Sequence, residues 1–213
     1  MVELWDDRLV IQAFFIFYGK AASAELSVKI ADDIQKQWNK PEGVVMYKSR
    51  LLPVLFKISG IYQPFLTDIE VIANLDPRKN FFRIEEFSKY HISYVDGIGC
   101  NSGYFKLDNL LDGSTTAAHE FGHTLGLHHP KVLDIRGKGV PGIMYPRGTI
   151  TDPLFQYDPK AKPLDQGGTL NPFKRVVTQR DIDMLNISKL HFENNKAIVG
   201  AFSSVFHEQD IEE

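Results

Sequence analysis

Apolar residues at every fourth position form the first clear pattern in the chain. The residues that share this spacing within Glu25–Asn39 are Leu26, Ile30, Ile34 and Trp38. Because residues four apart lie on one face of an α-helix, the pattern predicts an amphipathic helix that packs on a sheet. The helix is expected to begin near Ser23 and to end at the turn residues Lys40–Gly43.

A continuous apolar run, LVIQAFFIFY, precedes this helix at Leu9–Tyr18. It is open to two interpretations, a buried strand over Arg8–Tyr18 or the apolar part of a secretory signal. The small residues Ala21–Ala24 resemble a signal cleavage region. The preceding segment MVELWDDR is net acidic, however, whereas a signal peptide carries positive charge there. The strand is therefore the favoured interpretation.

The segments between this helix and residue 107 are mostly rich in β-branched and aromatic residues, which favour strands. Strands are expected at Val44–Lys57, with a continuation to Tyr62, and at Thr67–Leu75, Tyr90–Val95 and Ser102–Leu107. Arg83–Lys89 is expected to form a short helix, after a loop at Asp76–Asn80. A further helix is expected to begin at Ser114 or Thr115. This order predicts an α+β fold, with a twisted mixed sheet packed against two helices.

The C-terminal part of the chain has a different composition. Pro130–Phe173 is dense in Gly and Pro, which predicts a long loop, and we expect it to form one wall of a cleft. Thr178 and Asp181 resemble a capping box that opens a helix to about Leu190. The acidic end, Glu208–Glu213, is expected to fray. We expect one domain over 1–213, with an N-terminal subdomain 1–129 and a loop-rich C-terminal subdomain 130–213.

Composition and charge narrow the classes of function. The chain has 213 residues, 43% of them hydrophobic and 24% charged, as in ordinary globular proteins. A net charge of −3 argues against nucleic acid as a partner, and no apolar run is long enough to span a membrane. The single cysteine, Cys100, excludes an internal disulfide. It is expected to be a buried, inert thiol, although it could also cap a metal ion.

The residues His119, Glu120, His123, Gly126 and His129 fit the extended pattern H-E-x-x-H-x-x-G-x-x-H. On a helix, His119 and His123 lie one turn apart on the same face and can bind one metal ion. Gly126 can adopt a positive φ that ends the helix and brings His129 back as a third ligand. Three protein ligands leave the fourth position of Zn²⁺ for water, which is the catalytic arrangement. Glu120 is then the candidate base.

The length of this motif favours a zinc site over a chance match. A bare H-E-x-x-H on an apolar helix is weak evidence, but here both Gly126 and His129 occupy the further fixed positions. His128 could also bind metal, but its offset from Gly126 does not fit the pattern, so we expect it to face solvent or to support the ligands.

The chain resembles the metzincin clan of zinc metallopeptidases in this motif and in a candidate Met-turn at Gly142–Pro146, GIMYP. The resemblance implies a metzincin-like fold, one catalytic zinc ion, and Met144 as a hydrophobic floor beneath the zinc ligands. His129 followed by Pro130 is similar to the serralysins, whereas IMYP is more similar to the matrixins. The chain has neither the calcium-binding repeats of serralysins nor a cysteine-switch propeptide.

Two features around the candidate site depart from known patterns. Serralysins and astacins have a zinc-proximal Tyr two positions after the Met, where this chain has Pro146, so Tyr145 is only a candidate cleft residue. Calcium is considered because several acidic residues could supply oxygen ligands, but their spacing is not that of a calcium loop, and solvated charges are favoured. These residues are Asp108, Asp112, Asp152, Asp158 and Asp165.

The leading hypothesis is a monomeric zinc endopeptidase that acts on proteins or peptides, with Glu120 as general base. The substrate is expected to pair with a strand edge near Ser102–Leu107, antiparallel to it if the pattern of the clan holds. The alternative is a catalytically silent, zinc-stabilised binding protein of the same fold. A third interpretation is a bacterial toxin or effector that is secreted or injected without an obvious signal peptide; otherwise the protein is expected in the cytoplasm.

Overall fold

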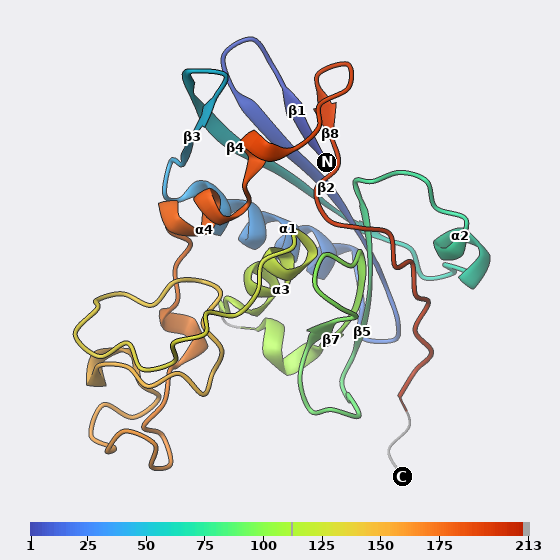
Figure 1. Ribbon diagram of the computed structural model, residues 1–213. Coiled ribbons are helices and arrows are strands. Elements are labelled where there is room, and N and C mark those ends of the chain that lie inside the picture. The colour runs from blue at the N-terminus through green and yellow to red at the C-terminus, as the bar shows by residue number, and fades with distance from the viewer. Residues whose placement is uncertain (112, 211–213) are drawn as a thin grey trace.

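The strand β2 (Leu9–Tyr18) lies at the centre of a curled mixed sheet, shown in Figure 1. The structure, a computed structural model, describes residues 1–111 and 113–210. The main strand order is β3 (Val44–Tyr47), β4 (Arg50–Tyr62), β2, β5 (Lys79–Glu85), β7 (Ser102–Lys106) and β6 (Tyr94–Val95). β1 (Val2–Leu4) pairs with the first part of β2 and also with β8 (Lys196–Ala197).

The central strands of this sheet are parallel. β2 is parallel to both β4 and β5, and β5 is parallel to β7, whereas β3 and β6 are antiparallel to their neighbours. A parallel strand in the middle of a sheet is covered on both faces, which explains why β2 is a continuous apolar run. The predicted strand over Arg8–Tyr18 and the predicted mixed α+β sheet are therefore confirmed.

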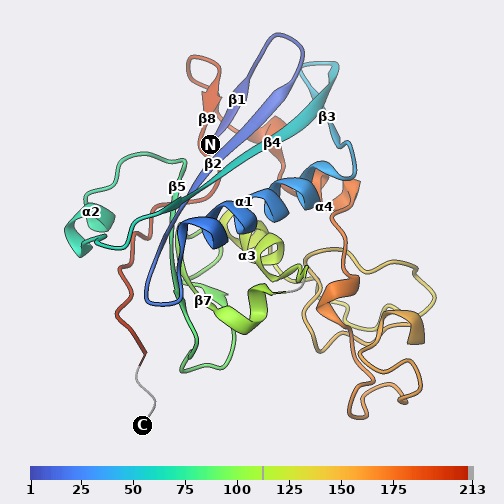
Figure 2. The ribbon, with the colours of Figure 1, turned by 180° about the vertical axis from the view of Figure 1, so that it is seen from behind.

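The helix α1 (Ala24–Asn39) covers one face of the sheet together with α3 (Thr116–Thr124), as Figure 2 shows. Ser23 caps α1 by accepting a 3.1 Å hydrogen bond from the backbone N–H of Leu26. Trp38 is fully buried, and its Nε1–H donates to the carbonyl of Ala118 at 3.0 Å. Its ring also packs against Phe121, with ring centroids 5.6 Å apart. The predicted amphipathic helix thus supports the helix that carries the candidate site.

The opposite face of the sheet is covered by α2 (Asp68–Ile72), and the strand predicted at Thr67–Leu75 is wrong. Local capping explains the helix. The hydroxyl of Thr67 accepts from the N–H of Glu70 at 3.3 Å, and the Glu70 carboxylate accepts from the N–H of Thr67 at 2.8 Å. This reciprocal pair satisfies two helix-end donors and overrides the strand preference of the β-branched residues that follow.

Two other predicted elements differ from the structure. The short helix predicted at Arg83–Lys89 is wrong, because Arg83–Glu85 forms the end of β5 between β2 and β7. All three residues pair with β7, and Arg83 also pairs with β2, and this pairing outweighs local helix preference. The strand predicted at Tyr90–Val95 is reduced to its last two residues, as β6.

The predicted loop after residue 129 is confirmed in the structure. Over residues 130–178 the only helical elements described are the 3₁₀ turns Pro153–Phe155 and Pro172–Lys174; a further such turn, Leu107–Leu110, precedes α3. α4 (Gln179–Met184) then begins at the predicted capping box of Thr178 and Asp181. It ends before Leu190 because Asn186 adopts a left-handed conformation with φ 50°, and a short 3₁₀ turn, Ile187–Lys189, follows. The division into subdomains at residues 129 and 130 stays a prediction.

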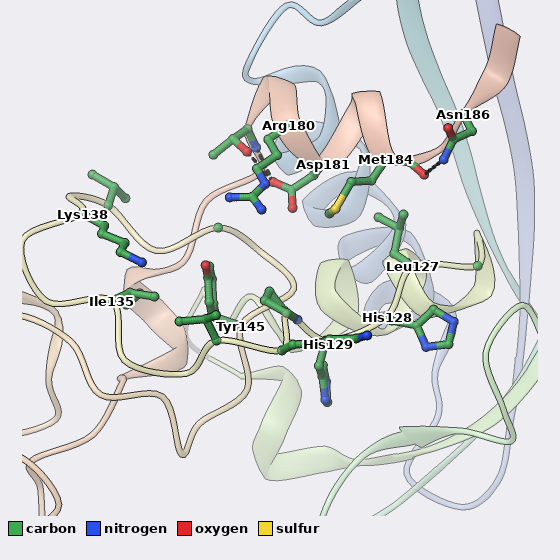
Figure 3. A pocket seen from close by; sticks show the side chains of 17 residues that line it. Leu127, His128, His129, Ile135, Lys138, Tyr145, Arg180, Asp181, Met184 and Asn186 are labelled. Atoms are coloured by element: carbon green, nitrogen blue, oxygen red, sulfur yellow. Dashed lines mark hydrogen bonds between the residues drawn. The ribbon is translucent and has the colours of Figure 1, made fainter.

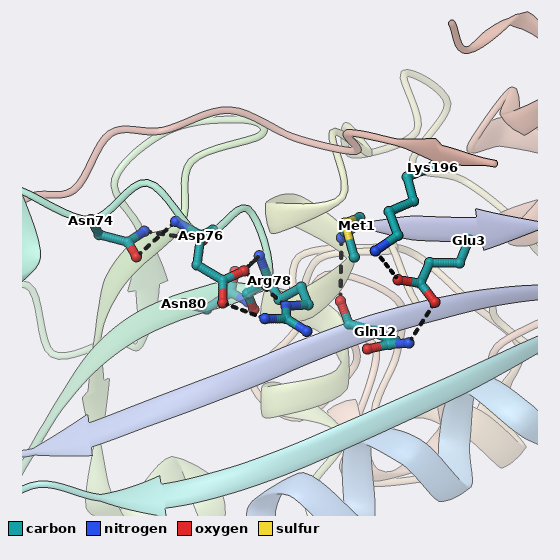
Figure 4. A network of polar contacts seen from close by, with 8 residues as sticks. All are labelled: Met1, Glu3, Gln12, Asn74, Asp76, Arg78, Asn80 and Lys196. Atoms are coloured by element: carbon teal, nitrogen blue, oxygen red, sulfur yellow. Dashed lines mark hydrogen bonds and ion pairs between the residues drawn. The ribbon is translucent and has the colours of Figure 1, made fainter. Parts of the chain in front are cut away.

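Polar contacts join the first and last strands to the centre of the sheet (Figure 4). The ammonium of Lys196 lies 3.3 Å from the Glu3 carboxylate, which also accepts a 3.0 Å hydrogen bond from the Gln12 amide. A second pair in this region joins Arg78 and Asp76 at 2.8 Å. The last segment of the chain is therefore fixed to the N-terminal half.

The segment after β8 runs back along β5 and β7 in Figure 1. Hydrogen bonds join it to the rest of the chain as far as Asp210. The backbone N–H of Asp210 donates to the Tyr104 hydroxyl at 3.3 Å, and its carboxylate accepts from the N–H of Lys89 at 2.8 Å. The fraying of Glu208–Glu213 stays a prediction. Residues 211–213 lie outside the described residues. Among the described residues, no helix is long and apolar enough to cross a membrane.

Candidate metal centre

Three residues of the predicted motif, His119, Glu120 and His123, lie on α3. Thr115 is the residue before the helix, but its hydroxyl makes no capping bond; the hydroxyl of the adjacent Ser114 instead accepts from the N–H of Thr116 at 3.1 Å. The two histidines are separated by one helical turn and face the same side. Both are buried, with 6% of His119 and 8% of His123 exposed.

The turn after α3 brings the third histidine back to the first two. Gly126 has φ +92°, a conformation that strains a residue with a side chain, and its N–H bonds to the carbonyl of His123 at 3.0 Å. The chain then reverses, and the Nε2 atom of His129 lies 3.0 Å from the Nε2 atoms of both His119 and His123. The predicted convergence of three histidines is confirmed.

The hydrogen bonds of the two helical histidines suit metal binding. The Nδ1 atom of His119 lies 2.7 Å from the carbonyl oxygen of Ile143, and that of His123 lies 2.7 Å from the carbonyl oxygen of Leu127. When Nδ1–H donates to these carbonyls, each Nε2 presents its lone pair to the shared point. A tetrahedral zinc ion about 2.05 Å from each nitrogen would hold them roughly 3.3 Å apart, close to the spacing observed. The three residues therefore fit a zinc ion.

Burial also sets the protonation of the histidines. It lowers the pKa of His119 well below its usual value and lowers the pKa of His123 to about 4. The positive charge of Arg175 acts in the same direction on both residues. The rings are therefore neutral at pH 7, which is the form that binds a metal ion.

Glu120 is buried beside the histidines, with 7% of its surface exposed. Burial raises the pKa of its carboxyl to about 8, opposed by the positive charges of Arg175 and Arg147 and by the backbone amide of Val95. A divalent cation at the histidines would lower this pKa further toward its ordinary value, because it favours the ionised form. Such a carboxyl can accept and release a proton near neutral pH.

The cleft in front of these residues has a volume of about 680 Å³. His119, Glu120 and His123 lie in its wall; one rim is formed by residues 92–98, around β6, and the other by Pro146–Gly148. Gly103 and Tyr104, within the strand edge predicted to meet substrate, Ser102–Leu107, are covered by β6. The strand beside the cleft is β6 instead.

Met144 packs directly against the helix that carries the histidines. It is 1% exposed, and a methyl group added to Gly122 would lie 2.3 Å from the Met144 sulfur. Glycine therefore leaves room for the Met144 side chain as it lies in the structure. The role of Met144 as a floor beneath a metal ion stays a prediction.

The side chain of Tyr145 lies in a second pocket, which adjoins the cleft at His128 and His129 and has a volume of about 760 Å³ (Figure 3). We call it the side pocket. It lies between Gly126–Val132, residues 135–145 and α4. The loop after His129 forms part of its wall, as predicted, and Tyr145 does not line the cleft that contains Glu120.

Arg175 is a buried site residue that the sequence did not reveal. It is 4% exposed, and its Nη1 lies 3.0 Å from the carbonyl oxygen of Tyr145 and 3.0 Å from Nδ1 of His119. Its Nε–H donates to the Thr115 hydroxyl at 3.0 Å. Burial lowers the pKa of Arg175 to about 10. An arginine in a Gly/Pro-rich loop is ordinarily solvated, so its residue type gave no signal.

The other candidates do not join the three histidines. His128 is exposed at the junction of the two pockets, and Cys100 is half-buried. Among the described residues, no second group of His, Cys, Asp or Glu side chains converges as a metal site, so the calcium hypothesis gains no support. Asp112, one of those acidic residues, lies outside the described part of the chain.

The chain thus has a three-histidine site in a cleft, with a buried glutamate beside it. Comparisons with protein-family models and with curated proteins find no match for this chain. The resemblance to the metzincins therefore rests on residues 119–146 alone.

Proposed function

We propose that this protein is a zinc-dependent endopeptidase of the metzincin type. The observation that carries the proposal is the convergence of the Nε2 atoms of His119, His123 and His129, with Glu120 in the wall of the same cleft. An open fourth metal position and an adjacent carboxylate are the two requirements for hydrolysis by an activated water.

The residues have distinct roles in the proposed reaction. His119, His123 and His129 would hold the zinc ion, which would act as a Lewis acid and make a water molecule easier to deprotonate. Glu120 accepts a proton from the attacking water and delivers it to the amine that leaves the cleaved peptide bond. Burial makes this carboxyl a stronger base than an exposed glutamate, as its raised pKa indicates. No covalent bond to the protein is required.

The rim around β6 supports a peptide as substrate. Residues 92–95, 97 and 98 line the cleft, and β6 pairs with β7 on one side only. Backbone groups on the other side of β6, apart from the Val95 amide that faces Glu120, can hydrogen-bond an extended peptide that is added as a further strand. Such a peptide would pass in front of Glu120 and the histidines.

The rival is a catalytically silent protein that binds zinc for stability. The Glu120 carboxyl is buried and has no salt bridge within the described residues, which is unfavourable. A structural zinc site would not need this carboxyl. Delivery outside the producing cell, as a toxin or otherwise, stays a prediction from the sequence. Metal analysis and peptide hydrolysis by the wild-type and Glu120→Gln proteins separate the two functions: zinc in both, with cleavage by the wild type only, is the expected result, and cleavage by neither favours the rival.

A further inference from the structure

The side pocket is rich in positive charge although the chain as a whole is acidic. Lys131, Lys138 and Arg180 line it, and Asp181 is the acidic residue among its lining. The net charge of the whole chain is −3. An excess of cations in a concave pocket raises the local concentration of anionic groups.

The acidic residue of the pocket is already engaged. The Asp181 carboxylate accepts hydrogen bonds from the backbone N–H and from the hydroxyl of Thr178, both at 2.7 Å, and so caps α4. Within the described residues, the side chains of Lys138 and Arg180 make no hydrogen bond or salt bridge. Figure 3 shows both side chains, with the Tyr145 hydroxyl, directed into the same part of the pocket.

The position of the side pocket links it to the candidate reaction centre. His128 and His129 line both the side pocket and the cleft. A peptide that crosses the histidines therefore has a side chain within reach of the side pocket close to the bond to be cleaved. The volume of about 760 Å³ accommodates one long side chain together with adjacent backbone.

We propose that the side pocket is a specificity site for an acidic side chain of the peptide substrate, with Lys138 and Arg180 as its charge partners and the Tyr145 hydroxyl as a further donor. The guanidinium of Arg180 suits a carboxylate because it presents paired N–H donors, and Lys138 adds a second positive charge. This inference rests on the proposed function, since it assumes that a peptide occupies the cleft.

The test measures binding without cleavage, in the zinc-loaded Glu120→Gln protein. Fluorescein-labelled decapeptides of Ala and Gly, amidated at the C-terminus, carry one central Glu or one central Gln. Such peptides can slide along the cleft, so the register need not be known. Fluorescence anisotropy is expected to give a Kd about tenfold lower for the Glu peptide than for the Gln peptide. In the Lys138→Gln/Arg180→Gln background, this difference is expected to disappear.

A matched control removes the same charge elsewhere. Lys29→Gln/Lys36→Gln changes two exposed residues of α1 that line neither pocket, and the Glu preference should persist. Equal binding of both peptides, no binding of either, or a preference that survives Lys138→Gln/Arg180→Gln overturns the inference. A third peptide carries the central Gln and a free C-terminal carboxylate. If it binds more tightly than the amidated Glu peptide, the pocket recognises a chain end and the inference is also overturned. If wild-type protein loaded with zinc hydrolyses no peptide, the proposed function fails, while the binding comparison still decides the role of the pocket.

Discussion

The carbonyl oxygen of Ile143 accepts a hydrogen bond from Nδ1 of His119 at 2.7 Å, so the candidate Met-turn, Gly142–Pro146, orients the first of the three histidines. The next residue, Met144, packs its sulfur against Gly122 in the helix between His119 and His123. One short loop thus sets both the orientation of a ligand and the packing behind it. Bound metal and folded loop are expected to stabilise each other.

Gly122→Ala tests this packing. A methyl group there would lie 2.3 Å from the Met144 sulfur and 3.3 Å from the Trp38 ring, so these side chains must shift. We expect the free energy of unfolding of the metal-free protein to fall by about 1–3 kcal/mol, the usual cost of overpacking. Urea unfolding followed by circular dichroism measures the change. Gly148→Ala is the control, because a methyl group at Gly148 meets no atom within 4 Å. Equal stability of the two variants would show that Met144 does not press on α3.

Arg175→Met is expected to lower the free energy of unfolding by about 1–3 kcal/mol. The substitution removes the donors to the Tyr145 carbonyl and the Thr115 hydroxyl, and it leaves both oxygens without this partner. The neighbouring Lys174→Met serves as the control, since Lys174 is exposed. Urea unfolding compares the variants, and an Arg175→Met protein as stable as Lys174→Met contradicts the structural role.

The rim of the cleft depends on a contact from the last segment of the chain. The His207 Nε2 atom lies 2.9 Å from the carboxylate of Asp96, the residue that follows β6. In His207→Ala, the backbone amides of Tyr94 and Val95 are expected to exchange with solvent about tenfold faster, because the rim opens more readily.

Hydrogen exchange followed by mass spectrometry checks this effect. His191→Ala is the matched variant, because His191 also pairs with an acidic residue, Glu193, but both are exposed. The exchange of the β6 amides should not change in His191→Ala. If His207→Ala also leaves that exchange unchanged, the last segment does not hold the rim.

His129→Ala and the adjacent His128→Ala separate the third ligand from its neighbour. In wild-type protein, free zinc at a thousandfold excess over its Kd should add about 4 kcal/mol to the free energy of unfolding. Most of this gain should be lost in His129→Ala and retained in His128→Ala, because the Nε2 atom of His129 alone lies 3.0 Å from those of the helical histidines. Differential scanning calorimetry with and without zinc measures both values. If the gain from zinc is lost in His128→Ala and retained in His129→Ala, then His128 and not His129 is the third ligand.

The sequence predicts the metal-binding residues of the site better than it predicts the residues that surround them. Residues four apart on a helix, followed by a glycine, restrict where three histidines can lie, so the triad follows from local geometry. The central strand and α1 follow from hydrophobic pattern for the same reason. Arg175, by contrast, lies 56 positions from His119, and nothing local reveals that a loop buries it there.

The wrong predictions have physical causes of the same kind. The β-branched residues of α2 favour a strand, but the Thr67–Glu70 capping box stabilises a helix there. Arg83–Glu85 forms a strand because it pairs with β7, and at Arg83 also with β2, and both strands lie far away in sequence. The side pocket is bounded by Pro130–Tyr145 and α4, and loop conformation is not encoded by a repeating pattern of polar and apolar residues.

In the proposed zinc-dependent hydrolysis, Glu120 moves the proton. The most direct test measures, in the same purified samples, zinc per chain by mass spectrometry and hydrolysis of a broad peptide library. We expect the wild-type and Glu120→Gln proteins each to bind one zinc ion, with hydrolysis at least about a thousandfold slower in Glu120→Gln. Undiminished hydrolysis in zinc-loaded Glu120→Gln protein, or zinc-loaded wild-type protein that cleaves nothing, would rule out the proposed role of Glu120.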